Sequence, residues 1–129
     1  MREIKGKFSI AERLRSFRYA YKGIADLIRF EHNFRIHLVI LIAVISAGII
    51  LRISLSEWMA ILFVSAFVLV SESFNTSFEH LSNAVSEETN EKIRRAKDTA
   101  AAAVLISVIA AIITGLMIFV PELIELFDI

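Results

Sequence analysis

The sequence predicts an all-α membrane protein built from one surface helix and three transmembrane helices. Hydrophobic residues make up 57% of the 129 residues, which exceeds the usual share for a soluble domain. Much of the excess is gathered into three apolar blocks, at Ile36–Leu51, Trp58–Ser71 and Thr99–Val120. A chain of this length holds one domain at most, so residues 1–129 are expected to form a single membrane domain.

A basic amphipathic helix is expected over residues 10–30, ahead of the first apolar block. Ser9 is suited to cap it, with Glu12 three residues later as the capping-box partner. No cleavable signal peptide is expected, because the apolar run begins only after this segment. A helix of this kind lies in the headgroup layer, and a soluble helix packed on a partner is the alternative. Its apolar stripe is Ile10, Leu14, Phe17, Tyr21, Ile24 and Ile28.

Three transmembrane helices are expected to follow, at about residues 34–51, 58–82 and 99–120. Ser56 is a candidate cap of the second span, and Trp58 would mark the outer interface as an aromatic anchor. The second helix contains no Gly or Pro and can continue to about Ala84. A polar turn is expected over Ser86–Lys92, and Pro121 is expected to end the third span.

The basic residues predict the orientation of the spans. Of the fourteen lysines and arginines, nine precede the first apolar block, one (Arg52) lies between the first and second, four lie between the second and third, and none follows the third. The positive-inside rule then places the N-terminus and the second loop in the cytoplasm. We therefore expect a multi-pass protein of the cytoplasmic membrane. The formal net charge of zero argues against nucleic acid as a partner, and the lack of cysteine excludes disulfides and thiolate metal sites.

Polar residues form a stripe along one face of the second span. They are Glu72, Asn75, Thr76, Glu79 and Asn83, at helical spacing. A carboxylate in a span costs at least a few kcal/mol unless something compensates it. A polar seam that only holds helices together is the alternative, but two acids on one face fit that role poorly.

Other polar groups map to the same side of the membrane. Glu31 to His37 stand at the start of the first span, and Arg94, Arg95, Lys97 and Asp98 stand ahead of the third. Acids could bind a divalent metal ion and neighbouring cations could hold phosphates. The sequence has neither a GxxxxGK[ST] loop nor a GxGxxG loop. The residues alone therefore predict a polyanion and metal site at the membrane surface, with a buried acid beneath it.

Two of these segments resemble a known family. They are Glu72-Ser-Phe-Asn75-Thr76-Ser-Phe-Glu79 and Lys97-Asp98-Thr-Ala-Ala-Ala-Ala-Val104-Leu105. Both are similar to motifs of the prokaryotic diacylglycerol kinase family. The resemblance covers essentially the whole chain. It implies a homotrimer in the bacterial inner membrane, with active sites shared between subunits. It also implies direct in-line transfer of the γ-phosphoryl group of MgATP to a lipid hydroxyl.

The resemblance also implies roles for individual residues. Glu72 would be the general base, and Glu31 and Glu79 would bind Mg²⁺. The expected nucleotide contacts are Tyr19, Glu31, Asn75, Glu79, Glu88, Thr89, Asn90, Lys97 and Asp98. The expected lipid contacts are Asn33, Phe34, Arg35, Ile36, His37 and Glu72. Asn83 and Asn90 stand where the family has Asp and often His, and Glu12 stands at the position of its N-terminal arginine, with Arg13 adjacent.

Three questions stay open at this level. The acceptor could be diacylglycerol or undecaprenol, and the Glu31–His37 segment looks more like relatives that use undecaprenol. A non-enzymatic bundle that conducts protons or cations would also explain buried acids. A membrane scaffold without a site is the third alternative.

Overall fold

The computed structural model describes residues 9–85 and 90–127, which are helical apart from short connections. The four helices are α1 (Ile10–Phe30), α2 (His32–Leu51), α3 (Leu55–Val85) and α4 (Glu91–Leu126). By length and composition, α2, α3 and α4 can each cross a bilayer. The structure confirms the all-α prediction of one amphipathic helix followed by three long apolar helices.

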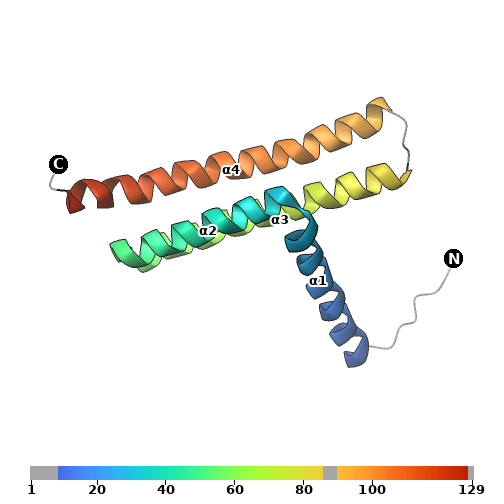
Figure 1. Cartoon of the computed structure of the whole chain (residues 1–129), viewed down its shortest axis with the longest axis horizontal. Coiled ribbons are helices and arrows are strands. Elements are labelled where there is room, and N and C mark those ends of the chain that lie inside the picture. Colours follow the sequence, from blue (N-terminus) through green and yellow to red (C-terminus); the bar gives the residue numbers. More distant parts are fainter. Residues whose placement is uncertain (1–8, 86–89, 128–129) are drawn as a thin grey trace.

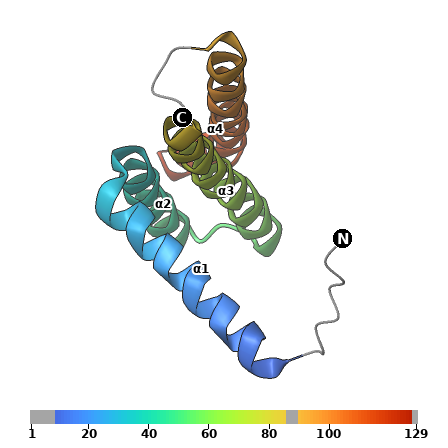
Figure 2. The ribbon, with the colours of Figure 1, turned by 90° about the vertical axis from the view of Figure 1, so that its right-hand side faces the viewer.

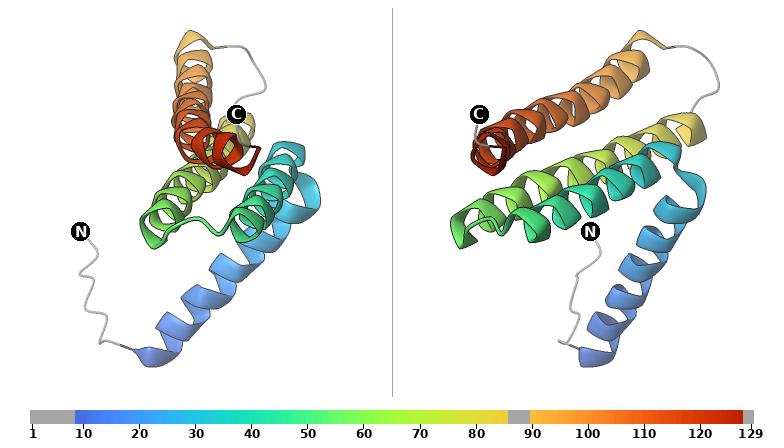
Figure 3. Two further views of the ribbon diagram at one scale, coloured as in Figure 1. Left: turned by 90° about the vertical axis from the view of Figure 1, so that its left-hand side faces the viewer. Right: turned by 60° about the vertical axis from the view of Figure 1, so that its left-hand side comes forward.

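Each of the three long helices runs antiparallel to the next along the chain, and α1 leaves them at a steep angle (Figure 1). Figure 2 shows α1 beside α2, on the side of the bundle away from α4. Figure 3 shows α4 packed along α3, which lies between it and α2. One end of the bundle holds the α2–α3 loop and the C-terminus of α4, and we call it the apolar end. The opposite end holds the α1–α2 junction, the end of α3 and the start of α4, and we call it the polar end.

The first helix has the predicted boundaries. The Ser9 side chain accepts a hydrogen bond from the Glu12 N–H at 3.4 Å, so the predicted N-cap is confirmed. The apolar side chains of α1 are exposed in the single chain, as Leu14 and Phe17 illustrate. Exposed apolar side chains opposite a basic face suit a helix that rests on a lipid surface.

The apolar end contains a buried hydrophobic cluster. Ile53, Ile61 and Ile118, from the α2–α3 loop, α3 and α4, form a buried cluster, and Trp58 packs against it. The α2–α3 loop is short because Arg52 adopts a left-handed conformation with φ 57°.

The cap of α3 differs from the prediction. The helix begins at Leu55, and Ser54 and Glu57 form a reciprocal capping box, so Ser56 is not the cap. The Glu57 carboxylate accepts the Ser54 N–H at 2.7 Å, and the Glu57 N–H reaches Ser54 Oγ at 3.4 Å. These two bonds use the three-residue spacing that Ser56 and Glu57 lack. The Ser54 hydroxyl also donates to the Glu57 carboxylate at 2.7 Å, and this bond, followed by that from the Ser54 N–H, lowers the pKa of Glu57.

The third span ends later than predicted. Helix α4 continues through Pro121 to Leu126, so Pro121 does not terminate it. Proline lacks only its own N–H and its φ suits a helix, so residues beyond it can restore the hydrogen-bond ladder. At the other end, the Asn90 side chain caps α4 and the helix begins at Glu91, inside the polar turn expected over Ser86–Lys92.

Candidate active site

The deepest polar residues of α3 are enclosed by neighbouring helices. Glu72 and Thr76 are only 3% and 7% exposed, and Asn75 is half-buried. Among the residues that the structure describes, no side chain forms a hydrogen bond or an ion pair with Glu72. One residue earlier, Ser71 and Ser107 join α3 to α4 by a hydrogen bond of 2.8 Å. Glu72 is thus a buried acid whose carboxyl group is not engaged by a described side chain.

Lys97 of α4 faces the outer part of the same stripe. Its Nζ atom lies 3.4 Å from Asn83 Oδ1 and 4.0 Å from Glu79 Oε1. Glu79 is exposed, and seven residues of helix place it about 10 Å along the axis from Glu72. The polar stripe therefore runs from a buried acid to an exposed acid beside a cation.

Glu31 lies where α1 ends and α2 begins. Its backbone is extended, with φ −101° and ψ 112°, and its N–H bonds to the Leu27 carbonyl oxygen at 3.0 Å. Its carboxylate does not cap α2; instead it approaches α3, where Glu31 Oε1 lies 3.3 Å from His80 Nε2. The junction carboxylate is thereby held beside the helix that carries Glu72 and Glu79.

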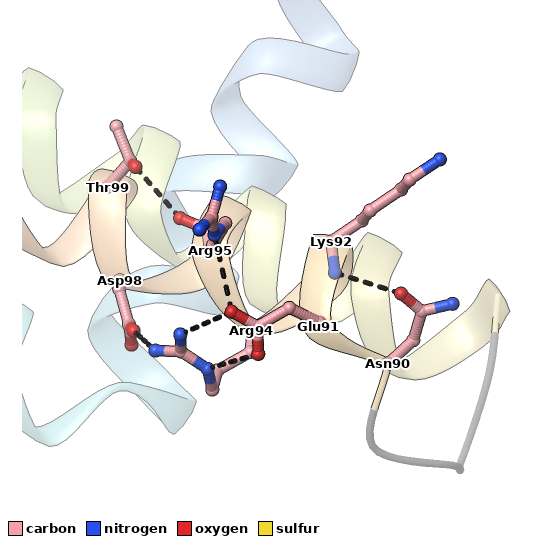
Figure 4. Close-up of polar contacts among 7 residues, drawn as sticks. All are labelled: Asn90, Glu91, Lys92, Arg94, Arg95, Asp98 and Thr99. Carbon is pink, nitrogen blue, oxygen red and sulfur yellow. Dashed lines mark hydrogen bonds and ion pairs between the residues drawn. The ribbon is translucent and has the colours of Figure 1, made fainter.

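Asp98 belongs to a charged network at the start of α4 (Figure 4). Arg94 bonds to both Glu91 and Asp98, and Arg95 also bonds to Glu91. The Arg94 guanidinium holds the pKa of Glu91 below the ordinary value for an exposed glutamate. Asn90 caps the helix by accepting the Lys92 N–H at 2.9 Å. Two expected nucleotide contacts, Asn90 and Asp98, therefore already have partners within α4.

The segment expected to contact lipid has side chains in several environments. Phe34 is buried at 5% exposure, whereas Asn33 and Ile36 are exposed. Arg35 lies 2.8 Å from the His32 ring through its Nη2 atom, rather than pairing with Glu31 one turn away. His37 lines an apolar groove of about 450 Å³ between α2, α3 and α4.

A second cavity, of about 600 Å³, separates α1 from α3, and we call it the α1–α3 cleft. Its α1 wall includes Gly23 and Asp26, and its α3 wall includes Thr76 and His80. Glu31 closes the cleft where α1 meets α2. The cleft therefore joins the surface helix to the helix face that carries the buried acid.

Of the other predicted nucleotide contacts, Tyr19 forms no bond to this cluster among the described residues. Tyr19 is 63% exposed on α1. Glu88 and Thr89 lie outside the described residues. In residues 9–85 and 90–127, no three His, Asp or Glu side chains converge as a preformed metal site. Mg²⁺ usually takes one or two carboxylates and completes its shell with phosphates and water, so the oxygen donors Glu31 and Glu79 are suited to it.

Reasoning from sequence missed His80 and the ion pairs that Arg94 forms with Glu91 and Asp98. His80 follows Thr76 by one helical turn, a spacing that could have placed it on the same side of α3. Arg94 was assigned to a general basic cluster, although its three- and four-residue spacing from Glu91 and Asp98 is typical of helix ion pairs.

The fold and the site define a membrane protein of three long apolar helices, with acids and cations gathered at one end of the bundle. Residues 18–119 match the family described as prokaryotic diacylglycerol kinase, and the chain belongs to that family. It is therefore a lipid kinase of the diacylglycerol and undecaprenol kinase family, in a multi-pass membrane fold. The family uses a lipid and ATP as substrates, which favours the enzyme over a conducting bundle or a scaffold.

Two relatives illustrate the similarity. The chain is 34% identical over 109 residues to the undecaprenol kinase of Bacillus subtilis (strain 168), an alignment that covers 84% of this chain and 89% of the relative. It is 36% identical over 112 residues to the diacylglycerol kinase of Synechocystis sp. (strain ATCC 27184 / PCC 6803 / Kazusa). That alignment covers 86% of this chain and 64% of the longer relative. The two relatives carry the names of the two acceptors that the sequence left open.

Proposed function

We propose that this kinase transfers the γ-phosphoryl group of MgATP directly to a membrane lipid alcohol, diacylglycerol or undecaprenol, with Glu72 as the general base. The observation that carries the proposal is the burial of Glu72, at 3% exposure and without a described partner, on the same helix face as an exposed acid beside Lys97. A carboxylate at this position can serve as the base for a lipid hydroxyl that stays among the apolar helices.

The reaction proceeds in one step in this proposal. The acceptor oxygen attacks the γ-phosphorus in line with the bond to ADP, and that bond breaks as the new P–O bond forms. Glu72 takes the hydroxyl proton, and ADP leaves with the electron pair of the broken bond. Phosphoryl transfer requires positioning and charge neutralisation more than covalent help from the protein. The separation of about 10 Å along the helix between Glu72 and Glu79 lets the hydroxyl stay in the bilayer while the triphosphate approaches from water.

The nucleotide is held at the polar end. Lys97 and Asn75 contact the triphosphate, and Asp98 contacts the nucleotide, after its carboxylate exchanges partners with Arg94. Glu31 and Glu79 would hold Mg²⁺, which would neutralise charge on the phosphates. The proposed contacts of the nucleoside are Tyr19 and residues 88–90. The path by which the lipid reaches Glu72 is lined by the first residues of α2, namely Asn33, Phe34, Arg35, Ile36 and His37.

We also propose that the chain functions as a homotrimer, with its N-terminus and polar end in the cytoplasm. Large apolar side chains on α3 are exposed in the single chain, including Phe63, Phe67 and Phe74, and neighbouring subunits or lipid must cover them. Light scattering of the protein in micelles should give the mass of three chains, and a tag at residue 1 should be protected from protease in right-side-out vesicles.

The decisive variant is Glu72→Gln. It keeps the shape of the side chain and removes the base, so kcat should fall about 10²–10⁴-fold, the usual contribution of general base catalysis. Equilibrium binding of MgATP should stay within a few-fold of wild type. The matched control is Glu57→Gln, on the same helix at the apolar end, where glutamine can still complete the capping box.

The assay compares diacylglycerol and undecaprenol in mixed micelles, with transfer of radiolabelled phosphate as the readout. We expect wild type to phosphorylate at least one of the two alcohols and Glu57→Gln to match it. Normal turnover by Glu72→Gln would exclude Glu72 as the base. Failure of wild type with every isoprenoid and glycerolipid alcohol, in the presence of MgATP, would overturn the proposed function.

A further inference from the structure

His80 is a polar residue at the edge of the α1–α3 cleft for which the reaction above has no role. It belongs to α3 and follows Glu79 directly, but its side chain is directed to a different carboxylate, that of Glu31. The contact joins residues 49 positions apart in the sequence. It therefore ties the α1–α2 junction to the helix that carries the proposed base.

The chemistry of the two groups fixes the direction of this hydrogen bond. A glutamate carboxylate only accepts, so the His80 Nε2 atom must carry the proton and donate it to Glu31 Oε1 at 3.3 Å. Among the described residues, no hydrogen bond engages the second carboxylate oxygen, Oε2. The imidazole thus fixes the carboxylate through one oxygen and leaves the other available.

The position of Glu31 is poorly explained by helix stability alone. It is the N-cap of α2, yet its side chain forms no capping bond, unlike Ser9 of α1 and Asn90 of α4. Glutamate is not among the residues preferred at an N-cap. A side chain that gives up a local bond to reach another helix indicates a role in the site instead.

We propose that His80 is a positioning residue, which orients the Glu31 carboxylate so that Oε2 can bind the metal ion of the nucleotide. This inference rests on the proposed function, in which Glu31 is a ligand of Mg²⁺. Hydrogen bonds to metal-binding carboxylates orient them, and loss of such a partner typically costs 10–100-fold in metal affinity or activity.

A purely structural role makes a different prediction. The side chains of His80 and Glu31 are 72% and 29% exposed, and an exposed pair of this kind adds little to stability. Removing His80 should therefore leave the melting temperature unchanged within about 2 °C. The expected effect is instead a rise of about tenfold in the KM for MgATP and in the Mg²⁺ concentration for half-maximal activity. The kcat at saturating magnesium nucleotide should change less than threefold.

Three variants of the full-length protein in micelles test this. His80→Phe keeps a ring and removes the donor, so it should show the full defect. His80→Gln supplies an amide N–H at a reach similar to that of Nε2, so its KM should return to within about threefold of wild type. Leu81→Ala is the control, because Leu81 is exposed and is the next residue of α3.

The outcomes separate this inference from the proposed function. If wild type phosphorylates lipid and His80→Phe has the same KM and Mg²⁺ requirement, the positioning role is wrong while the kinase assignment stands. A lowered melting temperature of His80→Phe with an unchanged KM for MgATP would overturn the positioning role and indicate a structural contact. Failure of His80→Gln to recover would also count against a role for the donated N–H.

Discussion

The two ends of the helix bundle are built from different kinds of contact. At the apolar end, Ile53, Ile61 and Ile118 are buried together, and Trp58 lies against Gly48 so closely that a methyl group has no room. At the polar end, hydrogen bonds and ion pairs between side chains join the helices, such as Glu31–His80 and Lys97–Asn83. Those side chains are mostly exposed, whereas the unpaired Glu72 and Thr76, deeper in α3, are buried.

The difference separates stability from chemistry along one helix. Close apolar packing gives a rigid structure, because dispersion contacts are lost when atoms move apart. Exposed polar pairs contribute little stability and can exchange partners with a substrate. Helix α3 carries both, with the Glu57 capping box at one end and Glu79 near the other. Substitutions at the polar end should therefore change kinetics, and substitutions at the apolar end should change melting.

The largest effect after Glu72→Gln is expected for Lys97→Met. This change removes the cation beside Glu79 while keeping a chain of similar length, so charge on the triphosphate is left uncompensated. We expect kcat/KM for MgATP to fall about 10²-fold, the typical loss for one such group. Lys92→Met is the control, because the Lys92 side chain points away from the charged network (Figure 4). Equal losses in both variants would indicate a general effect of charge rather than a contact at Lys97.

An intermediate effect, on stability, is expected for Gly48→Ala. The new Cβ would lie 2.7 Å from Trp58 Cη2 and 2.9 Å from Cζ2, so the packed indole must shift. Overpacking of this kind costs about 1–3 kcal/mol. Gly115→Ala is the matched control, since nothing lies within 4 Å of a Cβ at that position. Thermal unfolding in micelles should rank Gly48→Ala below wild type and Gly115→Ala at or above it, and the reverse order would refute the packing argument.

The smallest effect is expected for Ser107→Ala, midway between the two ends. It removes the 2.8 Å hydrogen bond between Ser71 and Ser107, next to Glu72. Polar bonds between membrane helices contribute about 0.6 kcal/mol on average. The melting temperature should fall slightly and kcat should stay within about threefold. A loss of kcat above tenfold would show that this bond helps to position Glu72.

Most of the fold could be predicted because the bilayer imposes a simple rule. A span needs about twenty apolar residues, so the three blocks identify three helices, and helical spacing identifies the amphipathic segment. The ends of the helices were harder to predict. Pro121 lies inside α4 because a proline removes one bond of a ladder that can resume, and the cap of α3 is Ser54 because the capping box needs a three-residue spacing to Glu57.

The site was predicted in part. Spacing on one helix was sufficient to place Glu72, Asn75, Thr76 and Glu79 on one face, and the structure buries the first of these as a stripe of that kind requires. Contacts between helices could not be predicted from the sequence. The packing of α1 and α2 on α3 depends on the angles between the helices, which the spacing of residues along one helix does not encode. The bond from His80 to Glu31 is of that type. The catalytic, nucleotide, metal and lipid roles of the site residues all stay predictions.

The unequal lengths of the helices have a consequence for how two immiscible reactants meet. At about 1.5 Å per residue, the twenty residues of α2 make about 30 Å, enough for the hydrocarbon layer, whereas α3 and α4 are about 16 Å and 24 Å longer. Much of that excess forms an overhang of α3 and α4 beyond the start of α2 (Figure 1). A lipid alcohol can then remain in the membrane while the nucleotide remains in water. The reaction can occur without either substrate leaving its own phase.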